Sequence, residues 1–420
     1  MKIEHNNISE NNFEQCTKCT ICTVYCPMLE VNPLYPGPKQ AGPDGERYRL
    51  KNAAYYDMGL KYCLNCKRCE VACPSGVRIG DIITIARAKN GKSKHKLRDV
   101  VLANTDFVGG MATMVAPIVN TTLGLKPVKR VMDAVLAVDH HRTTPNYASE
   151  KFTTSLRKNA AESQKQYPKQ VTYFHGCYAN YNYPQLGKDL VKILNAVGYG
   201  VNLMEGERCC GVAKMASGLM KDATRDAKRN LTEIRKATAA KREVVATSSS
   251  CTFALRDEYD HVLGLDNHDV RDSISLATRF LHRLVERGEV RLAFRKDFRM
   301  RVAYHSACHI ERLGWSIYAT SLLGMIEGLD LVMLPSQCCG IAGTFGFKKE
   351  NYKFSQAIGK SLFEAIEAAG VDFVTTECET CKWQIEMSTS AKVMNPISII
   401  AEALDVEETR RLNNIQLINQ

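Results

Sequence analysis

The sequence predicts a multidomain fold with a small α-helical N-terminal domain, a helical linker and two tandem α/β repeats. Three observations predict this fold. The run C-x2-C-x2-C-x3-C-P occurs twice near the N-terminus, at an offset of 47 residues. A second pattern, C then CC-G then C-x-x-C, occurs twice further along, about 130 residues apart. Around it, apolar runs alternate with amphipathic segments, as in β/α units. We therefore predict domains at 1–92, 93–168, 169–299 and 300–420.

Both N-terminal runs have the spacing with which bacterial two-cluster ferredoxins hold their clusters. Three closely spaced thiolates hold one [4Fe–4S] cubane, and the fourth cysteine of each run crosses to the other cluster. Zinc is the weaker alternative, because zinc motifs rarely use four cysteines in such a run. The assignment gives cluster 1 the ligands Cys16, Cys19, Cys22 and Cys73, and cluster 2 the ligands Cys63, Cys66, Cys69 and Cys26.

The segments beside these runs are predicted to be helical. A loop rich in proline and glycine, 35–43, separates the runs. Residues 46–64 and 79–88 have helical spacing of their apolar positions. The domain resembles the helical ferredoxin domain of the iron–sulfur subunits of succinate dehydrogenase and fumarate reductase.

Each later copy brings four or five cysteines together from three separate segments. A set of five favours a soft metal centre of several atoms, since a disulfide needs two cysteines and a zinc or cubane site needs four. Buried structural cysteines are the alternative, although packing alone rarely repeats a spacing in register. The first copy consists of Cys177, Cys209, Cys210 and Cys251, and the second of Cys308, Cys338, Cys339, Cys378 and Cys381.

This pattern resembles the cysteine-rich domain of the heterodisulfide reductase family. Iron–sulfur subunits of lactate, glycolate and anaerobic glycerol-3-phosphate oxidising systems share that domain. A complete five-cysteine copy in the family can hold a non-cubane [4Fe–4S] cluster, so the resemblance implies one in the second copy. The first copy departs from the motif, because Ser248 stands where the second has Cys378. Its four cysteines suffice for a cubane cluster or a zinc ion.

Each cysteine group of the repeats follows a predicted strand. Ligands of open α/β sheets collect beyond the carboxyl ends of the strands, so the three segments of each copy are expected to meet at one site. Three histidines beside these sites, His175, His305 and His309, either handle protons near a redox centre or are hydrogen-bonded loop residues. The strands are expected at 171–175, 201–204, 243–247, 301–304, 329–334 and 371–375, with helices at 186–197, 216–239 and 354–369.

The linker concentrates the positive charge of the chain. Of the net charge of +11, residues 91–170 carry +7, from 13 basic and 6 acidic residues. Residues 107–125 contain no charge and are about as long as a membrane span, but their glycines and Pro117 argue against one continuous helix. A helix from 128 to 138 and the basic residues Lys126, Lys129, Arg130 and Arg142 follow. The segment is either an interfacial anchor on an anionic membrane or a buried connector, and residues 140–170 are expected to form a surface connection.

Several functional classes leave no trace in the sequence. No G-x-G-x-x-G follows a strand, and neither Gly-Lys-Ser has the glycine that a P-loop needs. We therefore expect no catalytic residue, flavin or NAD on this chain, and no nucleic-acid partner. The first residues lack the apolar core of a signal peptide, and all 17 cysteines fall within motifs. This usage is typical of cytosolic metal binding rather than of a disulfide framework.

Along nearly its whole length, the sequence resembles the C-subunit family of bacterial anaerobic glycerol-3-phosphate dehydrogenases. The resemblance is carried by segments such as Pro36–Arg47, Cys251–Tyr259, Gln337–Thr344 and Glu379–Thr389. It implies a non-catalytic electron-transfer subunit that accepts electrons from a flavin dehydrogenase partner and passes them to membrane quinone. It also implies a peripheral location on the cytoplasmic side of the inner membrane. The alternatives are a thiol–disulfide subunit like heterodisulfide reductase, an iron–sulfur subunit of a lactate or glycolate oxidase, and a soluble zinc scaffold.

Overall fold

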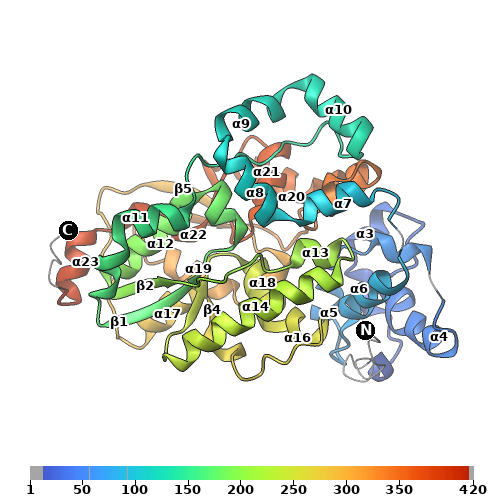
Figure 1. Ribbon diagram of the computed structural model, residues 1–420, viewed down its shortest axis with the longest axis horizontal. Helices are drawn as coiled ribbons and strands as arrows, with labels where there is room; N and C mark the ends of the chain where they lie inside the picture. The colour runs from blue at the N-terminus through green and yellow to red at the C-terminus, as the bar shows by residue number, and fades with distance from the viewer. Residues whose placement is uncertain (1–12, 56, 92, 416–420) are drawn as a thin grey trace.

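The computed structural model describes residues 13–55, 57–91 and 93–415. It has the predicted architecture: a helical N-terminal region, a helical linker and two α/β repeats (Figure 1). The N-terminal region packs at one end of the molecule, and the described C-terminus lies at the other. The N-terminal region contains α2 Ile21–Val24, α3 Pro27–Val31, α4 Gly45–Lys51, α5 Arg68–Val71 and α6 Ile79–Asn90, with shorter turns at Phe13–Gln15, Gln40–Asp44 and Met58–Tyr62.

The helical spacing of residues 46–64 predicted more helix than the structure has. Helix α4 ends at Lys51, and a 3-10 turn at Met58–Tyr62 follows after a break. Asn52 causes the break: its backbone is extended, and its side-chain oxygen accepts a hydrogen bond from the Ala54 backbone N–H at 3.1 Å. Asparagine competes with the helix in this way because its side chain can replace a backbone acceptor.

Each repeat is built on a four-stranded parallel sheet, in the order β2-β1-β3-β4 for the first and β6-β5-β7-β8 for the second. The first strand of each repeat, β1 or β5, therefore lies between the second and the third strand. The chain crosses over from it to one side and then to the other. The carboxyl ends of such a pair of strands border a crevice where ligands collect. The strands are β1 Lys169–Phe174, β2 Tyr199–Leu203, β3 Val244–Ala246, β4 Ile274–Leu276, β5 Met300–Tyr304, β6 Leu329–Met333, β7 Phe373–Thr375 and β8 Lys392–Met394.

Helices cover both sheets and join the repeats through one apolar core. Buried Leu190 and Ile193 of α12 pack in the same cluster as Ile397 and Ile400 of α22, so neither repeat closes its core alone. The helices of the first repeat are α12 Pro184–Ala196, α13 Val212–Ala216, α14 Met220–Ala239, α15 Ser249–Phe253, α16 Tyr259–His261 and α17 Ala277–Glu286, with short turns at Tyr178–Asn182, Ala254–Glu258 and Arg271–Ser273. Those of the second are α18 Cys308–Leu313, α19 Ser316–Leu323, α20 Tyr352–Ala369, α21 Glu379–Ser388, α22 Pro396–Ala403 and α23 Val406–Leu412, with turns at Phe345–Phe347 and Lys349–Asn351.

The linker begins with α7 Lys96–Ala103 and continues as an arm of three helices, residues 105–136. No single helix of the described chain has the length and apolarity to cross a membrane, but α8 and α9 together have both, with a bend of 106° between them. The uncharged segment is thus not one continuous helix, as predicted; the break lies at Val115, two residues before Pro117, whereas Gly109 and Gly110 lie within α8. The arm consists of α8 Thr105–Met114, α9 Ala116–Gly124 and α10 Lys126–Leu136.

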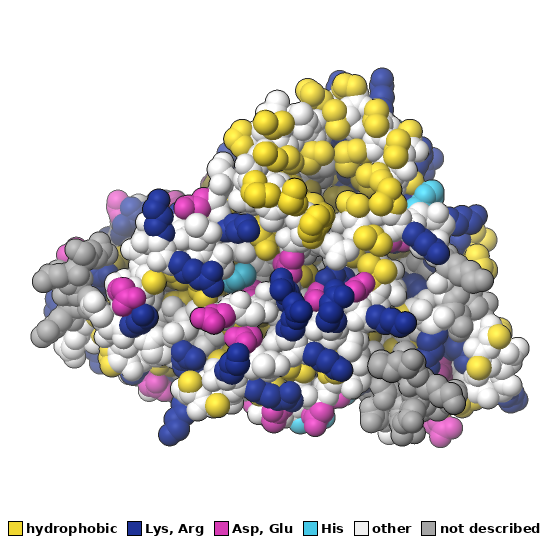
Figure 2. Space-filling view, viewed as in Figure 1, with side chains coloured by type: hydrophobic (Ala, Val, Ile, Leu, Met, Phe, Trp, Pro, Cys, Tyr) yellow, Lys and Arg dark blue, Asp and Glu magenta, His cyan; other side chains and the backbone are white. Residues whose placement is uncertain are grey.

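The outer face of the arm is apolar and exposed. Phe107, Met114 and Ile118 are 71%, 68% and 66% exposed, and Val131 and Val135 of α10 are exposed as well. In Figure 2 these helices form the large hydrophobic patch at the top of the view. The segment is therefore not a connector buried within this chain.

The stretch 140–170, predicted as a surface connection, instead contains helix α11, Phe152–Lys165. Phe152 is fully buried in the core of the repeats. The Phe152 ring packs directly on Gly187 of α12. A Cβ at position 187 would lie only 2.6 Å from ring carbons of Phe152, so the contact requires glycine there. The polar composition of α11 hid this single buried face.

Candidate metal centres

The two N-terminal cysteine runs have the same unusual backbone. Lys18 and Thr20 of the first run have φ angles of 60° and 63°, and Asn65 and Lys67 of the second have 54° and 63°. Residues other than glycine seldom adopt this left-handed conformation, which costs about 1–3 kcal/mol unless the surroundings impose it. Here it alternates with the cysteines. The backbone therefore curves around the three cysteines, so that the three thiols of a run can face one common ligand.

The fourth cysteine of each run lies with the other run. Burial raises the pKa of Cys26 to about 12, and the nearby Cys66 and Cys63 thiols add to the shift. Burial likewise raises the pKa of Cys22, with contributions from Cys16, Cys73 and Cys19. A pocket of about 350 Å³, part of it open to solvent, is lined by Cys26, Cys63, Cys66 and Cys69. The eight thiols thus form two groups of four.

In each repeat, three loops beyond the strands bring the cysteines together. The Sγ atoms of Cys210 and Cys251 are 3.3 Å apart, and those of Cys339 and Cys381 are 3.2 Å apart. Thiol hydrogen bonds join Cys177 to Cys209 and Cys308 to Cys338. These hydrogen bonds are the main reason why the pKa values of Cys177 and Cys308 are raised. The expected convergence of three segments is present in both repeats.

The glycine after each cysteine pair is required by the backbone. Gly211 and Gly340 have φ angles of 91° and 82°, in the left-handed region. A Cβ on Gly340 would also stand 2.0 Å from the carbonyl oxygen of Ser355 on α20. The second CC-G sequence is therefore a tight turn packed closely against helix α20.

Ser248 has a structural role that explains why a serine fits there. Its Oγ accepts a hydrogen bond from the Cys251 backbone N–H at 3.3 Å, which caps α15. The same hydroxyl donates to Glu379 Oε2 at 2.8 Å. Ser248 thus links the loop of the first repeat to the loop that contains Cys378, and it leaves the first repeat with four thiols.

Two residues distant in the sequence hold the first CC-G turn, and no sequence pattern marked either of them. The Cys209 backbone N–H donates to Asp106 Oδ2 of α8 at 2.7 Å, which joins this site to the arm. Asn230 of α14 is fully buried; its Oδ1 accepts from the Arg208 backbone N–H at 2.8 Å, and its Nδ2 donates to Tyr259 Oη at 2.9 Å.

The cysteine groups also touch one another. A hydrogen bond with the Cys308 thiol lowers the pKa of Cys66, so the second N-terminal group and the second repeat are direct neighbours. Cys308 and Cys338 pack in the same apolar cluster as the N-terminal cysteines. In turn, Ser250 Oγ of the first repeat lies 3.9 Å from Cys378 Sγ of the second. One line of contacts therefore connects the N-terminal groups to both repeats.

Ion pairs hold the N-terminal region on the second repeat at this junction. Arg68 donates to the hydroxyl of Ser336 at 3.0 Å, and its Nη1 lies 3.5 Å from a carboxylate oxygen of Glu311. Arg312 in turn lies 3.2 Å from Glu70. These partly buried contacts fix the position of Cys66 against Cys308.

Two of the three histidines make loop hydrogen bonds, and burial disfavours the charged form of all three. His175 Nδ1 lies 2.9 Å from the Gly176 carbonyl oxygen, and His309 Nδ1 lies 3.1 Å from Ser250 Oγ. Burial lowers the pKa of each histidine to about 4. His305 is 1% exposed, and among the described residues its ring nitrogens have no hydrogen-bond partner. Proton exchange near pH 7 is therefore not favoured at these positions.

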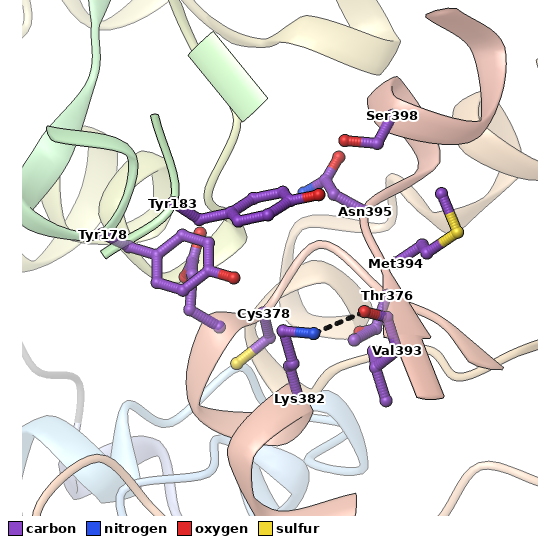
Figure 3. A pocket seen from close by; sticks show the side chains of 10 residues that line it. Tyr178, Tyr183, Thr376, Cys378, Lys382, Val393, Met394, Asn395 and Ser398 are labelled. Carbon is purple, nitrogen blue, oxygen red and sulfur yellow. Dashed lines mark hydrogen bonds between the residues drawn. The ribbon is translucent and has the colours of Figure 1, made fainter. Parts of the chain in front are cut away.

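A second pocket, of about 350 Å³ and partly open to solvent, lies where the repeats meet beside Cys378 (Figure 3). Tyr178 and Tyr183 flank it from the first repeat, and Asn395 and Ser398 from the second. Lys382 Nζ donates to the Val393 carbonyl oxygen at 2.6 Å across its floor. The pocket gives the second repeat a polar and aromatic approach from solvent.

The donor chemistry fits iron–sulfur clusters. None of the cysteines is in a disulfide. Each group offers four or five soft sulfur ligands at the end of loops, and iron–sulfur clusters are held by such thiolates. Bound clusters would supply one-electron chemistry; the chain itself supplies the thiolates, the turns that aim them and the apolar packing around them.

Comparison with known proteins agrees with these sites. Residues 12–77 match the 4Fe-4S dicluster domain family, and residues 171–256 and 302–386 each match the cysteine-rich domain family. The chain is 56% identical to the C subunit of the anaerobic glycerol-3-phosphate dehydrogenase of Escherichia coli K12, over 94% of its own length and all of the relative's.

More distant relatives match this chain over most or about half of its length. The chain is 24% identical to the B subunit of the fumarate reductase (CoM/CoB) of Methanothermobacter marburgensis, over 93% of this chain and 71% of that protein. It is 26% identical to "Lactate utilization protein A 2" of Bacillus cereus, over 56% of this chain and 99% of that protein. The paired cluster runs, the two cysteine-rich repeats and the full-length match to the Escherichia coli protein show that this chain belongs to the family of anaerobic glycerol-3-phosphate dehydrogenase C subunits.

Proposed function

We propose that the chain is the iron–sulfur electron-transfer subunit of an anaerobic glycerol-3-phosphate dehydrogenase. It accepts electrons from a flavin-containing partner and delivers them to membrane quinone. The observation that carries the proposal is the unbroken line of contacts between the cysteine groups, through Cys66 with Cys308 and Ser250 with Cys378. A protein that only stored metal would not need its sites to touch. The full-length similarity to a dehydrogenase C subunit supports the same role.

Four cysteine groups hold the proposed centres, in domains at 1–92, 169–299 and 300–420. The crossed positions of Cys26 and Cys73 support two cubane clusters in the N-terminal domain. Five thiols support a non-cubane cluster in the second repeat, and four support a cubane cluster or zinc in the first. Cys19 is exposed, which supports an approach of the dehydrogenase partner from the side of the N-terminal domain.

We also propose that the arm attaches the chain to the cytoplasmic face of the inner membrane as a peripheral subunit. Its apolar outer face is exposed, and Lys126 and Arg130 at the start of α10 are exposed beside it. Apolar area together with basic residues is what an interfacial anchor on anionic lipid needs. The hydrogen bond from the Cys209 backbone N–H to Asp106 holds the root of the arm to the first repeat, so a membrane bound by the arm would lie on the side of this repeat.

Lys349 holds the arm to the second repeat. It pairs with Asp133 of α10, and the Lys349 backbone N–H donates to the Ala137 carbonyl oxygen at 3.0 Å. Arg142, expected from the sequence to face lipid, does not: its side chain is buried, and only the other three basic residues are available to a membrane.

The test is anaerobic purification of the full chain, with iron and sulfide analysis and paramagnetic resonance spectra. Two cubane signals and a distinct third signal are expected. Addition of the reduced flavin partner should then reduce these centres, and a soluble quinone should reoxidise them. Zinc in place of iron in the N-terminal domain, or centres that the reduced partner cannot reduce, would refute the proposal. Turnover with a disulfide but not with quinone would favour the thiol–disulfide function.

A further inference from the structure

Arg142 is a buried cation with unused hydrogen-bond donors. It follows the arm, and its side chain is 1% exposed. Nη1 donates to Gln384 Oε1, and the guanidinium lies 4.6 Å from the ring centroid of Phe347. Among the described residues, Nε and Nη2 have no acceptor, and the nearby Asp139 is paired with His141. A buried charge without a partner costs several kcal/mol, so an anion is expected nearby.

The residues around Arg142 place it behind the second CC-G turn. Gln384 belongs to α21, the helix that begins beside Cys378, and its Nε2 donates to Ser355 Oγ at 3.2 Å. Ser355 is the residue against which Gly340 is pressed. Phe347 packs in one apolar cluster with Cys339, Cys378 and Cys381. Arg142 is thus separated from the second cysteine group by one layer of side chains or less.

The guanidinium remains charged in this position. Burial lowers the pKa of Arg142 to about 10, while the nearby Tyr352, Cys339 and Asp139 side chains oppose the shift. At neutral pH the group is therefore cationic. Its contact partners, an amide and an aromatic ring, provide no compensating negative charge.

We propose that Arg142 is a positioning residue for the centre of the second repeat, whose thiolate-bound negative charge its Nε and Nη2 donors stabilise. The inference rests on the proposed five-cysteine ligand set. Reduction adds negative charge to a cluster, and its potential depends on net charge and on hydrogen bonds to sulfur. Arg142 therefore raises the reduction potential of this centre.

The first repeat has a different arrangement behind its turn. There the neutral Asn230 is satisfied by the Arg208 backbone and by the Tyr259 hydroxyl. The buried cation nearest this turn, Lys214, is paired with Asp226, so the two repeats differ in unpaired charge beside the turn as well as in cysteine number. We expect the centre of the second repeat to be the more easily reduced of the two.

The experiment compares R142Q and R142K with wild-type full chain, purified anaerobically. K360Q is the matched control, because Lys360 is an exposed cation on α20, the helix that also contains Ser355. Iron and sulfide are counted first, and each signal is then followed by paramagnetic resonance in a redox titration. The two N-terminal clusters serve as an internal reference in the same sample.

R142Q is expected to lower the reduced-to-oxidised ratio of the second-repeat centre about tenfold at a fixed potential, which is about 59 mV for a one-electron couple. R142K should lower it less, and K360Q should leave it unchanged. If R142Q does not retain the centre, the R142K shift decides. The role of Arg142 is overturned if R142Q or R142K retains full iron and its second-repeat centre has the same reduction potential as in the wild type. A wild-type protein without iron in the second repeat overturns the ligand set, and with it this inference.

Discussion

The exposed apolar face of the arm should be measurable as membrane affinity. We consider the variant Phe107→Ser, Met114→Ser and Ile118→Ser, which removes three side chains that are each about two-thirds exposed. Full burial of such a side chain is worth about 1.5–3 kcal/mol, so each contributes about 1–2 kcal/mol if lipid covers its exposed part. Even with incomplete insertion, the loss is about 3 kcal/mol, or roughly a 100-fold fall in affinity.

The assay is flotation of the iron-loaded full chain with anionic and neutral lipid vesicles, at low and high salt. A matched control is available on the second repeat, where Ile317, Met325 and Met333 are also exposed but lie away from the arm. Their replacement by serine should not change binding. High salt should weaken wild-type binding only in part, because salt screens the contribution of Lys126 and Arg130 but not the apolar one.

The reasoning fails if the triple-serine variant of the arm binds anionic vesicles as tightly as the wild type. It fails also if the control variant loses as much affinity. Loss of binding to the flavin partner, with vesicle binding intact, would show that the arm is a subunit interface instead. Spectra and iron content of each variant verify that the cluster sites are unaffected.

Four further outcomes are expected. Cys73→Ser should damage the cluster of the first cysteine run and spare that of its own run, as separate resonance signals would show. Cys378→Ser should remove any non-cubane signal and leave both N-terminal cubane signals. Burial raises the pKa of Glu258 to about 7, so the protonated carboxyl contributes to the free energy of unfolding fully below pH 4.5. This contribution, about 3 kcal/mol, is lost as the pH rises through 7. Glu258→Gln should therefore flatten that part of the plot of thermal midpoint against pH. Despite burial, hydrogen bonds from Lys349 and His140 lower the pKa of Asp133 to about 2. The ionised carboxylate therefore stabilises the folded arm above pH 4, and this contribution to stability is lost as the pH falls through 2. Asp133→Asn should speed proteolysis of the arm at neutral pH.

The strands that carry cysteines were predictable because two local signals coincide there. Val171–Phe174 and Val302–Tyr304 are short runs with valine and aromatic residues typical of strands, and a cysteine follows each of them within four residues. The fourth strand of each sheet was not predicted. Strands β4 and β8 contain three residues each, and no cysteine follows them. A run of three is too short for any periodicity to show.

The cysteine ligands could be found from spacing, but their surroundings could not. Asp106 lies 103 residues from the Cys209 N–H that it accepts from, and Arg142 lies 242 residues from Gln384. A single acidic or basic residue on a helix or loop is ordinarily solvated, so nothing local marks it as buried beside a metal site. The basic character of the linker led to a wrong prediction for Arg142, which was expected to face lipid but is buried.

The contacts also give the cysteine groups of the two repeats different neighbours, although both repeats contact the arm and the N-terminal region. The cysteine group of the second repeat touches the N-terminal cysteine groups through Cys308, whereas the first CC-G turn is held to the arm through Asp106. A symmetric pair would have no preferred direction for electrons between these two ends. Here Ser248 removes a thiol on one side, and Arg142 adds a charge on the other. We expect these two differences to give the proposed centres of the repeats unequal reduction potentials, and a redox titration of their signals measures the sign of the difference without knowledge of the quinone.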